Sequence, residues 1–190
     1  PYTYPENKID IPSGFGRDGA VKYSDYALQK MFKKAKNKPW FKNTIFVFIA
    51  DHCASSAGKD EIDVANYHIP AIIYGQNFIQ TQKVTKLCSQ IDVFSTLFGQ
   101  LHWSYTSNFF GLDVFSKKYK ERALIGTYLK LALKRDNNVT ILSNKRTSTN
   151  YFWNEKTDKL NVLPVSKPEL DETISWYQTA DYLYLNNKLK

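Results

Sequence analysis

Cysteine is scarce and long apolar runs are absent in this sequence of 190 residues. Its 2 cysteines, Cys53 and Cys88, are too few for a zinc ribbon or a disulfide framework, although a single bridge between them stays open. The longest apolar run, Ile45 to Ala50, is far shorter than the roughly 20 residues of a membrane helix. We expect no secretory signal, because no basic segment followed by an apolar one opens the chain. A start methionine is also missing, so we expect a piece of a longer protein.

Acidic residues are outnumbered, with 18 Asp and Glu against 26 Lys and Arg and a net charge of +8. The lysines are scattered and accompany no RNA-binding aromatic motif or helix-turn-helix pattern, so nucleic acid is not an expected partner. A solvated surface with some attraction for anions explains the charge better. Hydrophobic residues make up 43% of the chain and aromatic residues 15%, which excludes intrinsic disorder. We expect a folded α/β protein.

The sequence divides into two regions, residues 1–118 and residues 119–190. The first opens with a loop over Tyr4–Gly19 and then alternates helices with buried strands. We expect these at Tyr23–Ala35 (helix), Thr44–Ile49 (strand), Ile69–Tyr74 (strand) and Ser89–Leu101 (helix). The unbroken β-branched and aromatic run of Thr44–Ile49 predicts a central parallel strand that is buried on both faces. Ser89 and Asp92 match a helix-capping box with Asp in place of Glu.

The second region predicts a small antiparallel sheet with a closing helix. Ala123–Leu133 fits a strand or a helix by pattern alone. Short apolar runs separated by polar turns then predict a meander, with strands at Val139–Leu142, Thr147–Trp153 and Leu160–Val165. The closing helix begins at Ser166, with Pro168 in its first turn. Its expected buried face consists of Leu170, Ile174, Tyr177 and Leu183.

Asp51 and His52 are the first candidate site residues, because they follow the strand Thr44–Ile49 directly. Open α/β sheets bind ligands at the carboxyl ends of their strands. A carboxylate oxygen and an imidazole nitrogen suit a divalent ion such as zinc or manganese. Spacing alone leaves metal ligation and a structural turn equally open. Cys53 could add a thiolate, although a small buried side chain is the simpler interpretation.

His68 precedes the strand Ile69–Tyr74 and is the second candidate. It is either a strand-edge histidine bonded to backbone or a group that contacts a metal or an anionic substrate. Parallel pairing would put His68 at the opposite end of the sheet from His52. To reach the same end, either the second strand runs antiparallel or residues 54–67 fold back over the crevice. We expect the loop to fold back, because Ala54, Ser55, Ser56, Ala57 and Gly58 are small.

Five segments in order carry a resemblance to a known family. They are Pro1-Tyr2, Tyr23–Leu28, Asn43–His52, Tyr67–Gly75 and Ser89–Asp92. This set resembles the C-terminal half of a sulfatase-like enzyme of the alkaline phosphatase superfamily, and most closely the lipoteichoic acid synthase and phosphoglycerol transferase group. The resemblance covers about residues 1–115 and is less distinct over the C-terminal sheet.

The resemblance implies part of an alkaline-phosphatase-like three-layer α/β sandwich with a small C-terminal antiparallel sheet and closing helix. It implies a metal-dependent transferase or hydrolase acting on phosphate esters, in which Asp51 and His52 bind a divalent metal (Mn, Zn, Mg or Ca). His68 matches a histidine that contacts substrate in some branches. The substrate would be an anionic phosphate or sulfate ester, for example a lipid-linked one. The parent protein would be held at the extracytoplasmic face of the membrane by N-terminal helices.

The sequence departs from the family pattern because the threonine nucleophile and an acidic metal ligand belong to the family's other half. We therefore expect no catalytic nucleophile in this chain, and no activity from the chain alone. Two alternatives stay open: a sulfatase that hydrolyses sulfate esters, and a non-catalytic module that uses the fold for binding.

Overall fold

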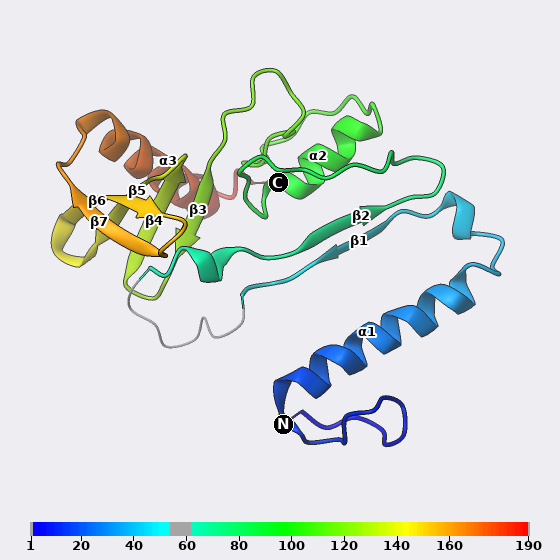
Figure 1. The fold of residues 1–190 in the computed structure, drawn as a ribbon. Coiled ribbons are helices and arrows are strands. Elements are labelled where there is room, and N and C mark those ends of the chain that lie inside the picture. The colour runs from blue at the N-terminus through cyan, green and yellow to red at the C-terminus, as the bar shows by residue number, and fades with distance from the viewer. Residues whose placement is uncertain (1, 54–61, 190) are drawn as a thin grey trace. The chain divides into compact units, whose positions relative to one another are not determined.

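The computed structural model describes residues 2–53 and 62–189, which form two compact units (Figure 1). The first unit is Pro1–Ile45 with Gly75–Asn77, and the second is Phe46–Tyr74 with Phe78–Lys190. These units do not coincide with the regions 1–118 and 119–190, whose boundary stays a prediction. Across the described ranges, no helix combines the length and apolarity needed to cross a bilayer.

The first unit is dominated by α1, Gly16–Ala35, and a short 3-10 turn at Phe41–Asn43. The helix ends where the sequence predicts but begins at Gly16 instead of Tyr23, so the last part of the predicted entry loop is helical. Gly19 lies within the helix and does not break it, and a Cβ at this position would collide with the hydroxyl of Tyr4. The Tyr4 ring stacks on Tyr23 with centroids 5.0 Å apart. Here glycine permits close packing on the helix instead of breaking it.

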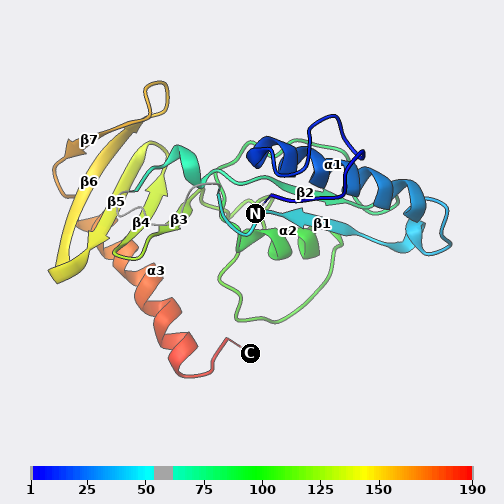
Figure 2. The same cartoon turned by 90° about the horizontal axis from the view of Figure 1, so that it is seen from below.

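The second unit begins with a two-stranded ribbon of β1, Phe46–Ile49, and β2, Ala71–Tyr74 (Figure 2). The strands are antiparallel, with Phe46 opposite Tyr74 and Ile49 opposite Ala71. The prediction of a parallel interior strand is therefore wrong for this pairing, and β1 is half-buried instead of buried on both faces. An apolar run indicates burial but carries no information on the direction of the neighbouring strand. The 21 residues of 50–70 are long enough for a crossover or for a return.

Helix α2, Asp92–Gln100, begins after a turn at Ser89. One half of the predicted capping box is present, because the Ser89 amide donates to Asp92 Oδ2 at 2.9 Å. The Ser89 hydroxyl does not cap the helix. It accepts a hydrogen bond from the amide of Leu124 at 2.9 Å instead.

The C-terminal sheet has the predicted antiparallel meander in the order β3-β4-β5-β6-β7. Its strands are Ala123–Gly126, Lys130–Arg135, Asn138–Ser143, Thr147–Asn154 and Lys159–Leu163. The ambiguous run 123–133 is thus split between two strands. The buried core of this sheet consists of Ile125, Ala132, Val139 and Ile141, together with Ile62 and Val64.

Helix α3, Lys167–Leu185, closes the sheet as predicted. Its residues Leu170, Ile174, Tyr177 and Leu183 are half-buried, as the predicted face requires. The Tyr177 hydroxyl lies 2.9 Å from the carbonyl oxygen of Ile125 and 2.7 Å from that of Ala132. Burial raises the pKa of Tyr177 to about 12, so the hydroxyl remains a donor at any physiological pH.

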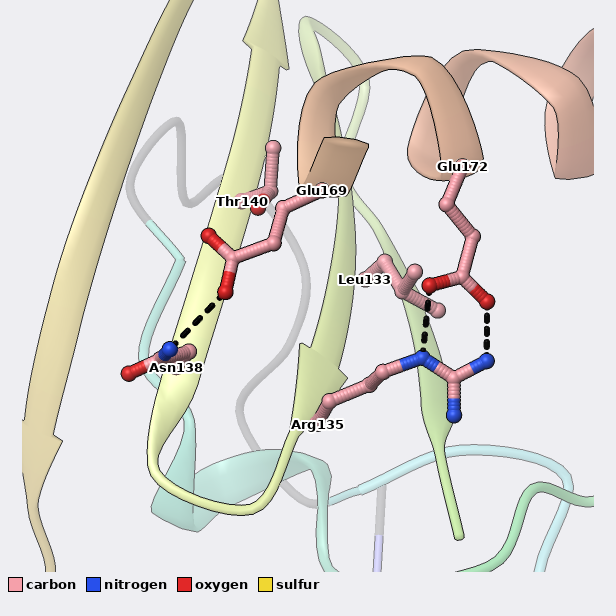
Figure 3. A pocket seen from close by; sticks show the side chains of 6 residues that line it. All are labelled: Leu133, Arg135, Asn138, Thr140, Glu169 and Glu172. Atoms are coloured by element: carbon pink, nitrogen blue, oxygen red, sulfur yellow. Dashed lines mark hydrogen bonds and ion pairs between the residues drawn. The ribbon is translucent and has the colours of Figure 1, made fainter. Parts of the chain in front are cut away.

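A polar seam joins α3 to the sheet around a small pocket (Figure 3). Arg135 donates from Nε to Glu172 at 2.8 Å, and this contact lowers the pKa of Glu172. Glu169 accepts from Asn138 at 2.9 Å and from Asn150 at 2.7 Å. These contacts of Glu169 and Glu172 attach α3 to the sheet.

Candidate functional site

The predicted ligand pair lies where the ribbon of β1 and β2 ends. The ladder extends one step beyond β1, because the amide of Ala50 donates to the carbonyl of Pro70 at 3.2 Å. Asp51 and His52 follow with side chains that are 88% and 67% exposed. Asp51 Oδ2 lies 3.4 Å from His52 Nε2. The two atoms that could bind a metal therefore face each other at the exposed end of a strand.

Hydrogen bonds of the backbone orient this pair. His52 Nδ1 lies 2.8 Å from the carbonyl oxygen of Cys53. A carbonyl only accepts, so Nδ1 carries the hydrogen, and in the neutral ring Nε2 then presents its lone pair. Metal-binding histidines commonly have this arrangement, with one nitrogen donating to a carbonyl and the other facing the metal. The Asp51 carboxylate is held as well, since its Oδ1 accepts the His52 amide at 3.0 Å.

This donor set fits part of a divalent-metal site. One carboxylate oxygen and one imidazole nitrogen are ligands that zinc and manganese accept, and four to six ligands are normal for such ions. Within residues 2–53 and 62–189, no group of three or more His, Cys, Asp or Glu is arranged to hold a metal. Asp51 and His52 would thus supply two ligands and need further ones from elsewhere.

His68 lies at the same end of the ribbon as His52. It follows the 3-10 turn Ala65–Tyr67 and is exposed. Because β1 and β2 are antiparallel and Ile49 pairs with Ala71, the residues that follow β1 and those that precede β2 lie at the same end of the ribbon. The antiparallel strand therefore gives this placement, and the expectation that the intervening loop folds back is not needed to explain it. Residues 54–61 of that loop lie outside the described residues. Whether His68 contacts substrate stays a prediction.

The two cysteines do not pair. Cys53 is half-buried and Cys88 is exposed, and both are free thiols. Although Cys88 as a residue is exposed, partial desolvation of its thiol and the nearby charge of Asp92 raise the pKa of that thiol, which disfavours the thiolate. Cys53 contributes its backbone to the site, because its carbonyl orients the ring of His52.

Gln90 is a neighbour of the pair that the sequence did not single out as a site residue. Its side-chain Nε2 donates to the carbonyl oxygen of Ala50 at 2.8 Å and lies 3.4 Å from that of Asp51. Gln90 itself is exposed and belongs to the turn that precedes α2.

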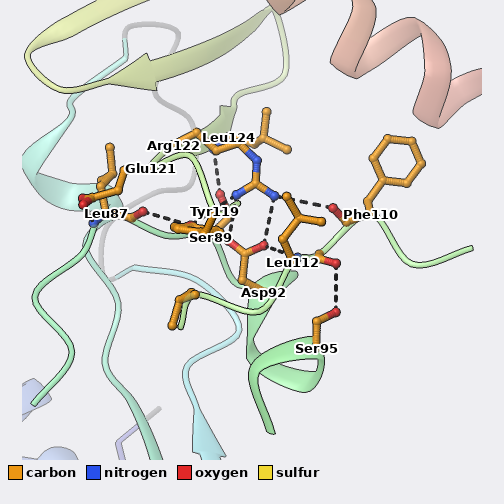
Figure 4. A network of polar contacts seen from close by, with 12 residues as sticks. Leu87, Ser89, Asp92, Ser95, Phe110, Leu112, Tyr119, Glu121, Arg122 and Leu124 are labelled. Atoms are coloured by element: carbon orange, nitrogen blue, oxygen red, sulfur yellow. Dashed lines mark hydrogen bonds and ion pairs between the residues drawn. The ribbon is translucent and has the colours of Figure 1, made fainter. Parts of the chain in front are cut away.

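A buried polar network holds this turn (Figure 4). Its centre is Asp92, which pairs with Arg122 and also accepts the amide of Leu112 at 2.8 Å. Burial on its own would raise the pKa of Asp92, but hydrogen bonds from Arg122, Leu112 and Ser89 outweigh it and hold that pKa below its ordinary value. Tyr119 donates to Asp92 at 3.1 Å, and burial beside that carboxylate raises the pKa of Tyr119.

The sequence alone gives little indication that Gln90, Asp92 and Arg122 act together. The Ser89–Asp92 segment is recognisable as a helix start. Arg122 lies 30 residues further on, and Gln90 reaches a carbonyl 40 residues before it. Contacts over such separations leave no local pattern.

Comparison with known proteins places these features in a larger fold. Residues 16–103 match the family model described as Sulfatase, a range that includes Asp51, His52, His68 and Gln90. The whole chain is similar to the crystal structure of a protein in the alkaline phosphatase superfamily from Vibrio parahaemolyticus, with a TM-score of 0.89 and 30% sequence identity. The match covers 100% of this chain and 47% of that one, so the chain spans about half of its length. The mixed α/β architecture of the alkaline phosphatase superfamily is thereby confirmed.

Proposed function

We propose that this chain is part of a metal-dependent enzyme that transfers or hydrolyses phosphate esters, with Asp51 and His52 as two of its metal ligands. The observation that carries the proposal is the arrangement of Asp51 Oδ2 and His52 Nε2, 3.4 Å apart at an exposed strand end. The matches to Sulfatase and to an alkaline phosphatase superfamily structure support an enzyme class that acts on phosphate or sulfate esters and generally needs a divalent metal.

Asp51, His52 and His68 would each have a different role in this reaction. Asp51 would bring negative charge to the metal and His52 a neutral nitrogen, with the ring held by the carbonyl of Cys53. A bound divalent ion would polarise the ester oxygens and lower the pKa of an attacking hydroxyl. His68, at the same ribbon end, would contact a non-bridging oxygen of the substrate or assist the leaving group. The nucleophile would come from polypeptide outside this chain, so we expect the chain alone to be inactive.

The finer parts of the proposal rest on the resemblance of the five sequence segments. They are a phosphoglycerol-transferase-like reaction, a lipid-linked phosphate ester as substrate, and a parent protein anchored at the extracytoplasmic face of the membrane. A sulfatase is the second candidate, because residues 16–103 match the Sulfatase model.

The test uses the longer protein that contains this chain, freed of metal with a chelator and then supplied with Mn²⁺ or Zn²⁺. We expect turnover of an aryl phosphodiester that depends on the metal, and much slower turnover of the matching aryl sulfate. Faster turnover of the sulfate would favour the sulfatase. If Asp51→Ala leaves both metal content and turnover unchanged, the proposal is wrong.

A further inference from the structure

Gln90 bonds to the backbone on both sides of the Asp51 α-carbon. The carbonyl of Ala50 belongs to the peptide plane before Asp51, and the carbonyl of Asp51 belongs to the plane after it. Nε2 of Gln90 lies 2.8 Å from the first oxygen and 3.4 Å from the second. An amide NH₂ group has two hydrogens and can donate to both. The two dihedral angles of Asp51, and with them the direction of its side chain, are therefore constrained by one side chain.

The peptide plane before these two is held by the other strand of the ribbon. The amide of Ala50 donates to the carbonyl of Pro70 at 3.2 Å, as the last bond of the β1–β2 ladder. Three successive planes leading to His52 are thus tied to neighbours. The chain leaves β1 in a defined direction although Asp51 and His52 are themselves highly exposed.

Gln90 is in turn held on both sides. The residue before it, Ser89, donates its amide to Asp92 and accepts the amide of Leu124 at 2.9 Å each. Asp92 is 1% exposed and is fixed by Arg122, which is also 1% exposed. The long side chain of Gln90 therefore extends from a rigid turn to the end of β1.

We propose that Gln90 is a positioning residue for the metal site, which sets the backbone of Asp51 so that Asp51 and His52 reach a metal together. This inference rests on the proposed function, in which these two residues are ligands. Gln90 is exposed and so buries little apolar surface, which makes a purely structural role a poor explanation for ordering this flexible side chain. Hydrogen bonds that orient metal ligands typically change metal affinity 10- to 100-fold.

The experiment measures Mn²⁺ binding by calorimetry, with the metal ion alone, in the longer protein that contains this chain. Gln90→Met keeps the length of the side chain and removes its donor. We expect it to weaken Mn²⁺ affinity by about 10-fold or more, with the melting temperature of the metal-free protein unchanged. The matched control is Gln82→Met, at an exposed glutamine outside the network, and it should bind Mn²⁺ like the unmodified protein. Asp51→Ala should bind none.

The outcomes separate this inference from the proposed function. Unchanged Mn²⁺ affinity in Gln90→Met, with binding lost in Asp51→Ala, would overturn the role of Gln90 and leave the metal site standing. A lower melting temperature of Gln90→Met with unchanged affinity would overturn it too, because the residue would then be structural. Unchanged affinity in Asp51→Ala would instead contradict the proposed function.

Discussion

Arg122 and Asp92 form a two-pronged ion pair, with Nη1 to Oδ2 at 2.8 Å and Nη2 to Oδ1 at 2.9 Å. Both side chains are 1% exposed. The guanidinium carbon also lies 4.5 Å from the ring centroid of Trp176 on α3. One arginine therefore connects the start of α2, the entry to β3 and the closing helix. Parallel hydrogen bonds of this type are strong and geometrically specific.

Removal of one member of this pair should strongly destabilise the folded protein. Arg122→Met leaves the Asp92 carboxylate buried without its cation, and breaking a buried pair in this way typically costs about 3–5 kcal/mol. We expect urea denaturation to show a loss of that size in the free energy of unfolding. The control is Asp171→Asn in the exposed Lys167–Asp171 pair, whose side chains are 84% and 57% exposed. Exposed pairs contribute about 1 kcal/mol or less, so equal losses in both variants would contradict the expectation.

The same carboxylate should make stability depend on acid pH. The pKa of Asp92 is lowered in the folded protein, so folding is favoured by the ionised form. This contribution is complete above the ordinary Asp pKa of about 4 and is lost as the pH falls through the lowered folded value. Denaturation curves at pH 7 and pH 3 should show a large stability difference between the unmodified protein and Asp92→Asn at pH 7 and a smaller one at pH 3. A difference that does not change with pH would argue against this.

Gly111 should tolerate no side chain. A Cβ at this position would collide with the carbonyl oxygen of Ile91 and lie 3.1 Å from the α-carbon of Asp92. Because these are backbone atoms, the turn that carries Gln90 would have to move, and overpacking of this kind costs about 1–3 kcal/mol. The matched control is Gly126→Ala in β3, where the nearest atom would be Leu131 Cδ2 at an ordinary 3.7 Å. Thermal denaturation should show a clear loss for Gly111→Ala and little change for Gly126→Ala.

Local patterns predicted most elements of this fold. Turn residues and apolar periodicity located the meander, and Ser166 and Pro168 located the start of α3. The pattern failed where tertiary contact decided the outcome. Gly19 looks like a helix breaker until Tyr4 packs against it, and the all-apolar β1 gives no sign of its antiparallel partner.

The sequence predicted some residues of the candidate site and missed others. Asp51 and His52 are visible because they follow a strongly apolar strand, and strand ends are where such folds bind ligands. The position of His68 depends on strand direction, which no local pattern encodes. Gln90 and Arg122 escaped prediction because their partners are 40 and 30 residues away, and a glutamine or an arginine in a loop is ordinary.

Substitution of His52 and substitution of His68, the two histidines at the ribbon end, should have different effects on metal content and on turnover. In the longer protein, His52→Ala should lose metal and metal-dependent turnover together, because Nε2 of His52 is the proposed ligand. His68→Ala should keep most of its metal and slow turnover by about 100-fold or more, as expected for the loss of one group that stabilises charge on the substrate. His102→Asn is the control, since His102 lies just after α2, is exposed and has a φ of 53° that asparagine also adopts. Metal content by mass spectrometry and phosphodiesterase rates are measured on the same samples. Equal metal loss in His52→Ala and His68→Ala would make His68 a ligand and end its assignment as a substrate contact.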